Sequence, residues 1–181
     1  MKQRAALLID NLQLNKWQLD ALDAANKTID IVLVLNCQNT NNKKNYVKNF
    51  LYYALNSITL KNYLTRRQSF NLPEAEIVSF QSIYEGAWQS LPEKVYKELE
   101  SGSIDVVIKF GMSLLRLDEK RSLPPIFSYH HGNPSKYRGR PAGFYEILNQ
   151  EKTTGIIVQS ISNELDSGVK RLCKSLTYIY Q

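Results

Sequence analysis

The stretch Ala5-Ala6-Leu7-Leu8-Ile9, which stops at Asp10-Asn11, begins the pattern that decides the fold of this chain. Five consecutive apolar residues that end at a polar turn are typical of a strand buried on both faces. A helical spacing of apolar residues follows, at Leu14, Trp17, Ala21, Leu22 and Ala25. Ile29–Leu35 then reads I-D-I-V-L-V-L, a second strand. Strand, helix and strand in this order predict a parallel pair with a right-handed crossover.

The same alternation continues to the end of the chain. Further strands are predicted at 75–80 and 104–109, in the apolar run before His130, at 154–161 and at 172–180. Helices are predicted at 47–58, at 144–148, and from a capping box at Ser90-Leu91-Pro92-Glu93 through Leu99. The pattern predicts an α/β, Rossmann-like fold of three layers with a mostly parallel central sheet.

Length and composition favour one cytoplasmic domain. The chain has 181 residues, of which 43% are hydrophobic and 22% charged, so one domain over 1–181 is expected. Cys37 and Cys173 are too few for a disulfide framework. The apolar run 5–9 is too short for a signal peptide, and Ile31–Leu35 is far too short to span a membrane. We therefore expect no membrane partner.

The net charge of +6 leaves two interpretations open. A basic protein attracts anionic partners such as nucleic acids or polyphosphates, but modest basicity is equally typical of a solvated lysine face. Tyrosines interleave with lysines and arginines between positions 46 and 67. They could stack on bases, or they could pack a helix onto the sheet, and no recognisable RNA-binding motif decides between the two.

The candidate chemistry lies at two predicted strand ends. Both histidines, His130 and His131, follow an apolar run, and Asp166 lies on a turn 36 residues after His130. A histidine and a carboxylate at strand ends make an acid/base pair plausible, although a histidine there is often only structural. A metal site would need further ligands that the sequence does not supply. We therefore expect no metal.

Two common kinds of site are excluded by missing motifs. The turn after the first strand has no glycine, so the G-x-G-x-x-G dinucleotide fingerprint is absent. No G-x-S-x-G nucleophile elbow occurs either. What remains is a site without an enzyme nucleophile, in which a histidine and a carboxylate act beside backbone groups of Phe110–Leu115. Such a site suits direct transfer of a group from a carrier to an acceptor.

Four motifs between Ile104 and Gly168 together resemble those of the 10-formyltetrahydrofolate-dependent formyltransferase family. They occur in the family's order, as Ser128-Tyr129-His130, Tyr137-Arg138-Gly139, Thr154-Gly155 and Leu165-Asp166-Ser167-Gly168. Upstream, Asp105–Ile108 and the following Gly111-Met112 are similar to the family's strand and pocket loop for the pterin ring. The first hundred residues carry no diagnostic motif.

The resemblance implies a function and a set of site residues. The implied reaction moves a formyl group from 10-formyltetrahydrofolate to a primary amine, carried by methionyl-tRNA or by a nucleotide-linked amino sugar. His130 would stabilise the oxyanion, and Asp166 would set the state of the histidine and help to deprotonate the amine. The folate pocket would be lined by Phe110, Gly111, Met112, Leu114, Leu115 and Leu165. Lys136, Arg138 and Arg140 would meet acceptor phosphates or remain a solvated loop.

The sequence departs from the family pattern at Ser128, where the family has an asparagine that donates to the oxyanion. A serine hydroxyl can donate, but it is shorter and less fixed. Losing one such donor costs roughly 100- to 1000-fold in a protease. The alternative function is therefore a catalytically weak or inactive binding domain of the same type. The tRNA-binding C-terminal domain of methionyl-tRNA formyltransferases has no counterpart here, so the chain is either a minimal or a C-terminally truncated catalytic domain.

Overall fold

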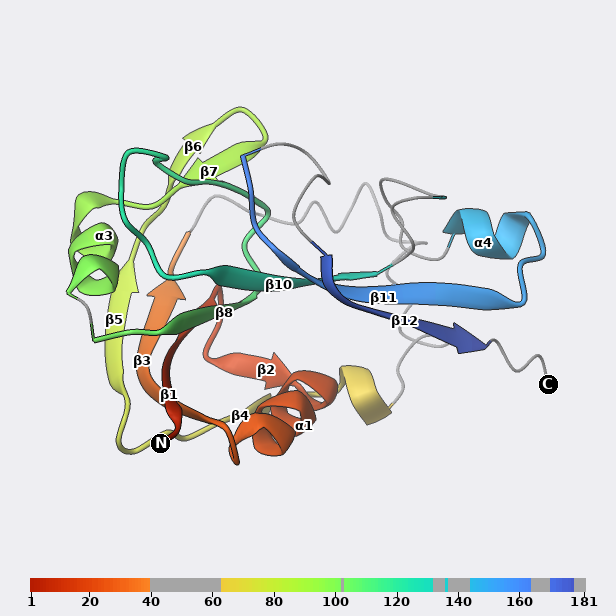
Figure 1. Cartoon of the computed structure of the whole chain (residues 1–181), viewed down its shortest axis with the longest axis horizontal. Coiled ribbons are helices and arrows are strands. Elements are labelled where there is room, and N and C mark those ends of the chain that lie inside the picture. The colour runs from red at the N-terminus through yellow and green to blue at the C-terminus, as the bar shows by residue number, and fades with distance from the viewer. Residues whose placement is uncertain (40–62, 102, 132–135, 137–143, 164–169, 178–181) are drawn as a thin grey trace, which may run out of the picture.

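The computed structural model describes residues 1–39, 63–101, 103–131, 136, 144–163 and 170–177 (Figure 1). The helices among them are α1 (Lys16–Ala25), α3 (Glu93–Glu100) and α4 (Phe144–Leu148), with a 3₁₀ turn, η1 (Tyr63–Thr65). The strands of the main sheet are β1 (Gln3–Ile9), β3 (Ile29–Cys37), β5 (Glu76–Phe80), β8 (Val106–Phe110), β10 (Ile126–His131), β11 (Thr153–Ser160) and β12 (Lys170–Thr177). The shorter strands are β2 (Gln13–Asn15), β4 (Arg67–Ser69), β6 (Ile83–Glu85), β7 (Trp88–Ser90) and β9 (Leu114–Arg116).

Seven strands form the main sheet in the order β12-β11-β10-β8-β1-β3-β5. The five strands from β10 to β5 are parallel neighbours, and β11 and β12 extend the sheet in antiparallel pairs. In Figure 1 this extension runs to the right, and α4 lies above the right-hand end of β11. The predicted α/β fold with a mostly parallel sheet is confirmed.

Helices cover the two faces of the parallel strands. On one face α1 packs Trp17 and Leu22 against a cluster formed by Leu7, Ile9, Val34 and Phe110. On the other face α3 packs Val95 and Leu99 against a cluster that includes Leu8, Leu35 and Val107. Burying apolar surface on both faces explains why the central strands are near-continuous apolar runs. The three layers predicted from the sequence are present.

The helix α3 does not begin with the predicted capping box. Its N-cap is Pro92, which offers no side-chain hydrogen bond, and Ser90 is the last residue of β7. Ser90 is held in strand pairing, opposite Ile83 on β6 and Arg116 on β9. The prediction was wrong because Ser90 lies in a small three-stranded sheet and not at the start of the helix. The predicted helix at 47–58 lies outside the described residues.

The chain changes direction across the sheet at β1. Strands β3 and β5 follow on one side of β1, and β8 and β10 lie on the other side. The reversal places a topological switch point between β1 and β8, which is where open α/β sheets bind their ligands, outside the carboxyl ends of the strands. The residues that leave these ends are Asp10 after β1, Gly111 after β8 and the histidines at the end of β10.

Candidate functional site

A row of polar side chains crosses the sheet near the carboxyl ends of its strands. Ser128 on β10 is paired with Lys109 on β8 and with Gln159 on β11. Residues directly opposite one another on paired strands project from the same face. His130 follows Ser128 by two residues, so it lies on that face too, one step closer to the strand end. The register therefore brings Lys109, Ser128, Gln159 and His130 to one face.

Ser128 and His130 are both half-buried. Within the described part of the chain, the hydroxyl of Ser128 makes one long contact, 3.5 Å from its Oγ to the carbonyl oxygen of Tyr129. That length is beyond the usual range for a hydroxyl donor, so the contact is weak. The main chain of His130 lies opposite Ile157, which is fully buried. The strand register thus sets a half-buried hydroxyl and imidazole beside a buried isoleucine.

The turn after β8 has an unusual backbone. Gly111 has a φ of 98° and Met112, a residue with a side chain, has a φ of 49°. The amide of Met112 donates to Oδ2 of Asp10 at 3.3 Å, and its carbonyl oxygen accepts from Nζ of Lys109 at 2.8 Å. This turn was predicted as the pocket loop, and the structure places it beside the carboxyl end of β1.

The side chains of this turn point in different directions. Phe110 belongs to the α1 face, where it stacks on Tyr129 with ring centroids 5.7 Å apart. Met112 and Leu115 are 8% and 2% exposed and belong to the cluster beneath α3. Leu114 is half-buried. Phe110 therefore lies on the face opposite Ser128, and Leu114 keeps part of its apolar surface accessible.

Several residues implied by the resemblance lie outside the described residues: Asp166, Leu165, Arg138 and Arg140. Their roles remain predictions. Lys136 is described and exposed, and its Nζ lies 3.4 Å from a carboxylate oxygen of Glu151. After the segment that carries Asp166, the chain enters β12 at Lys170, which is paired with Gln159. Gln159 is in turn paired with Ser128, so β12 begins two strands away from Ser128, at the same level of the sheet.

Sequence reasoning missed three polar residues of this region. Asp10 was used only to mark the end of a strand, and Lys109 only to close the run Val106–Ile108. A lysine directly before the turn of a buried strand was a signal that could have been noticed, because lysine is rarely buried without a partner. Gln159 has a buried Oε1 for which the described residues offer no hydrogen-bond partner. Its place beside Ser128 depends on the strand register, which the sequence does not state.

Cys37, at the end of β3, does not supply a nucleophile. Cys37 is 2% exposed at the end of β3, and burial raises the pKa of its thiol, an effect that a hydrogen bond with Ser82 partly opposes. A buried thiol with a raised pKa stays protonated and unreactive. Within the described ranges, no three His, Cys, Asp or Glu side chains are grouped to hold a metal ion, and no helix is long and apolar enough to cross a membrane.

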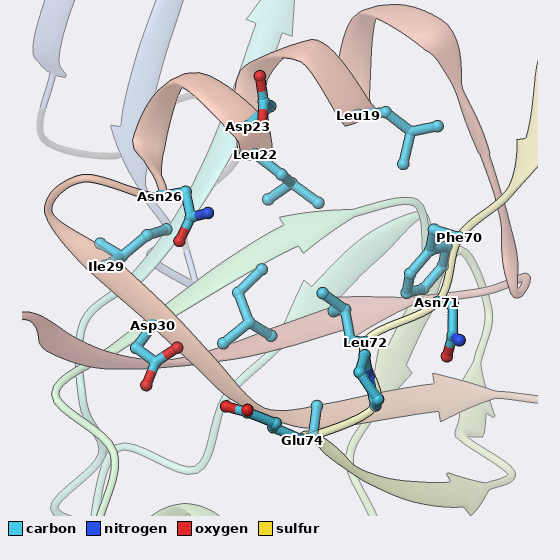
Figure 2. Close-up of a pocket in the computed structure, with 13 residues that line it drawn as sticks. Leu19, Leu22, Asp23, Asn26, Ile29, Asp30, Phe70, Asn71, Leu72 and Glu74 are labelled. Carbon is cyan, nitrogen blue, oxygen red and sulfur yellow. The ribbon is translucent and has the colours of Figure 1, made fainter.

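A cavity of about 320 Å³ lies at the opposite end of the sheet. Figure 2 shows it between α1, the start of β3 and the segment 70–75, with Leu19 and Leu22 projecting from the helix. The cavity is also lined by the acidic residues Asp23, Asp30 and Glu74. Because Asp30 is at the amino end of β3, this cavity is remote from Ser128 and His130 and belongs to neither predicted site.

Comparison with known proteins gives similarity in structure but none in sequence. No protein-family model matches the chain, and no curated protein sequence does. Phosphoribosylglycinamide formyltransferase from Anaplasma phagocytophilum superposes with a TM-score of 0.57 at 15% identity, covering 99% of this chain and 74% of that chain. A formyltetrahydrofolate deformylase from Pseudomonas syringae pv. tomato str. DC3000 gives 0.53 at 14% identity, covering 98% of this chain and 52% of that one.

HypX from Aquifex aeolicus, in complex with tetrahydrofolic acid, gives a TM-score of 0.51 at 12% identity. The match covers 99% of this chain and 22% of HypX. The chain thus spans about half of the deformylase and less than a quarter of HypX. Across its whole length it has the formyltransferase fold. The resemblance inferred from the motifs is confirmed at the level of fold.

Proposed function

We propose that this chain transfers a formyl group from 10-formyltetrahydrofolate to a primary amine. The observation that carries the proposal is the placement of Ser128 and His130 on one face of β10, toward its carboxyl end, on the strand next to β8, which flanks the switch point of the sheet. Proteins of the same fold include a formyltransferase, a formyltetrahydrofolate deformylase and a protein bound to tetrahydrofolic acid. The match in fold supports a folate as the formyl donor. The placement of Ser128 and His130 supports stabilisation of the formyl oxygen during transfer.

The residues around the turn after β8 fit a folate donor. A pterin ring is flat and carries donors and acceptors along its edge, so a pocket for it needs an apolar wall and backbone groups. Leu114 is half-buried and supplies apolar surface, while the exposed Gly111 brings main chain without a side chain. Leu165 would add to this wall. When bound, the donor supplies an activated formyl group.

His130 and Ser128 would act on the charge that develops on the formyl oxygen. Both side chains can donate hydrogen bonds, and fixed donors are the strongest single contribution to this kind of catalysis. Asp166 would hold the imidazole in its working state and accept the proton that the amine loses. The weak contact of Ser128 with Tyr129 leaves its hydroxyl able to turn toward a substrate oxygen.

The acceptor is a primary amine on a larger, phosphate-bearing molecule in this proposal. Lys136, Arg138 and Arg140 form a basic segment that suits phosphate groups, because lysine and arginine make charge-assisted hydrogen bonds to them. Nucleotide-linked amino sugars and charged tRNA both present an amine together with phosphates.

Purified protein incubated with 10-formyltetrahydrofolate and a panel of primary amines tests the proposal. Tetrahydrofolate release and formylated amine are measured together, so that transfer is separated from hydrolysis. We expect formylated amine to appear for at least one phosphate-bearing acceptor. If the protein bound no folate and neither transferred nor hydrolysed the formyl group, the proposed enzymatic function would be refuted.

A weak or inactive binding domain is the second candidate, and Ser128 is the observation that favours it. If serine is a poor oxyanion donor, Ser128→Asn restores a longer amide donor and should leave turnover equal or raise it, by at most the roughly 100- to 1000-fold contributed by one such donor. Binding of tetrahydrofolate without turnover in either form would favour the binding domain. A clear loss of turnover in Ser128→Asn would show that serine is the better residue for this site.

A further inference from the structure

The turn after β8 holds a residue in a conformation that its side chain disfavours. Met112 adopts a left-handed φ of 49°, directly after Gly111 at 98°. A residue other than glycine persists in this region only where the surroundings fix it, and such residues concentrate at active sites and ligand clamps. Two side chains, Lys109 and Asp10, hydrogen-bond to the main chain of Met112.

Lys109 holds the carbonyl side of Met112. Its side chain is 8% exposed, and its Nζ donates to the carbonyl oxygen of Met112 at 2.8 Å. Burying an ammonium group is costly unless it is hydrogen-bonded, so this lysine needs partners of the kind that Met112 provides. Lys109 also lies opposite Ser128 in the paired strands. Lys109 therefore holds the turn through its side chain, while its main chain lies next to Ser128 on the neighbouring strand β10.

Asp10 holds the amide side of Met112 from the end of β1. Its Oδ2 accepts from the Met112 amide at 3.3 Å, across 102 positions of sequence. The carboxylate lies so close to Gly111 that a Cβ there would be only 2.6 Å from Oδ1. Gly111 is thus required twice, for its positive φ and for the approach of Asp10.

The two clamps meet at the switch point between β1 and β8, where this fold is expected to bind its ligand. We propose that Asp10 and Lys109 are positioning residues: they grip the two peptide groups of Met112 and hold the turn 110–114 in the shape that receives the formyl donor. This inference rests on the proposed function. Neither side chain needs to touch the reacting atoms.

Lys109→Met tests the role directly, because methionine keeps most of the volume and removes the ammonium. Tetrahydrofolate binding is measured by calorimetry, and kcat and KM are measured with 10-formyltetrahydrofolate. We expect donor affinity to weaken about tenfold, the loss of one charge-assisted hydrogen bond, while kcat at saturating donor stays within about twofold. A fall in kcat with an unchanged KM would overturn the proposal, because the ammonium would then act on the chemistry.

Asp10 gives a second test that survives if Lys109→Met fails to fold, since its side chain is exposed. Asp10→Ala should weaken donor binding by several-fold, and Asp10→Asn should lose less because its amide oxygen can still accept from Met112. Asp105 offers a matched control: its carboxylate accepts from the Arg4 amide at 2.7 Å and joins β8 to β1 at their amino ends. Asp105→Ala should leave donor affinity unchanged.

The outcomes separate this inference from the proposed function. If the unaltered protein binds no tetrahydrofolate, the proposed function fails and the role of the pair fails with it. If the unaltered protein binds, but Asp10→Ala and Asp105→Ala alter the affinity equally or not at all, only the positioning role is overturned. A loss confined to Asp10→Ala and Lys109→Met supports it.

Discussion

The central strand β1 and the strand β10 are built for different tasks. Every residue from Ala5 to Ile9 on β1 is 0% exposed, whereas β10 has a buried Ile126 followed by half-buried residues through His130. Both strands belong to the same sheet and both are extended parallel to β8. The difference indicates that β1 supplies stability and β10 supplies accessible chemical groups.

The positions of the two strands explain the difference. β1 lies between β8 and β3, and its side chains belong alternately to the clusters beneath α1 and α3. β10 lies further out and is paired with the antiparallel strand β11. A strand in such a place can expose one polar face without opening the core. Substitutions on β1 should therefore change stability, and substitutions on β10 should change turnover.

The largest expected effect is on β10. His130→Ala should lower turnover by roughly 100- to 1000-fold, the usual cost of losing one donor to the oxyanion, and leave the unfolding temperature nearly unchanged. Asp166→Ala should act alike. Tyr129→Phe is the control on the opposite face of the strand, where the ring packs against Trp17 and Phe110. Equal turnover in His130→Ala and the unaltered protein would remove His130 from the site.

The next effect is on β1 and concerns stability. Leu7 is 0% exposed, so Leu7→Ala should lower the free energy of unfolding by about 2–5 kcal/mol, measured by urea denaturation. Ile77→Ala on the edge strand β5 is the control, because Ile77 is 54% exposed and should cost little. If Leu7→Ala lowered kcat while the protein remained folded, the division between scaffold and chemistry would be wrong.

The scaffold was predictable because its sequence signal is local. The apolar runs of β1, β3 and β8 and the helical spacing of α1 gave these elements to within a few residues of their observed bounds. Each run is buried on both faces, so hydrophobicity alone marks it. The three-residue strands β2, β4, β6, β7 and β9 carry too few residues for a periodic pattern, and Ser90 was assigned to a helix cap for that reason.

The candidate site could be proposed from the sequence only in part because its geometry is not local. His130 and Ser128 were predicted as site residues from a motif along one strand, and their roles stay predictions. Lys109 and Gln159 join them through the pairing of three strands, which no short stretch of sequence encodes. Asp10 meets Met112 across 102 positions. Contacts of that kind depend on the order of strands in the sheet, and only the fold supplies this order.

The smallest expected effect probes the scaffold through pH. Burial raises the pKa of Cys37 above the usual thiol value of about 8.5, so the folded state holds this proton more tightly than the unfolded state. Below pH 8 the Cys37 thiol is largely protonated in both the folded and the unfolded state, and its contribution to the free energy of unfolding is fully present. As the pH rises past 8.5 the unfolded chain loses its proton first, and stability falls until the folded thiol also ionises.

At pH 9.5, one unit above the pKa of the unfolded thiol, this loss should reach at most about 1.4 kcal/mol, and it should disappear in Cys37→Ala. Urea denaturation at pH 7.5 and 9.5 measures it as the difference between the two proteins. Tyr96, whose pKa burial also raises, is present in both and cancels. Equal pH dependence in the two proteins would mean that the end of β3 admits water, and that the scaffold is less closed than its burial indicates.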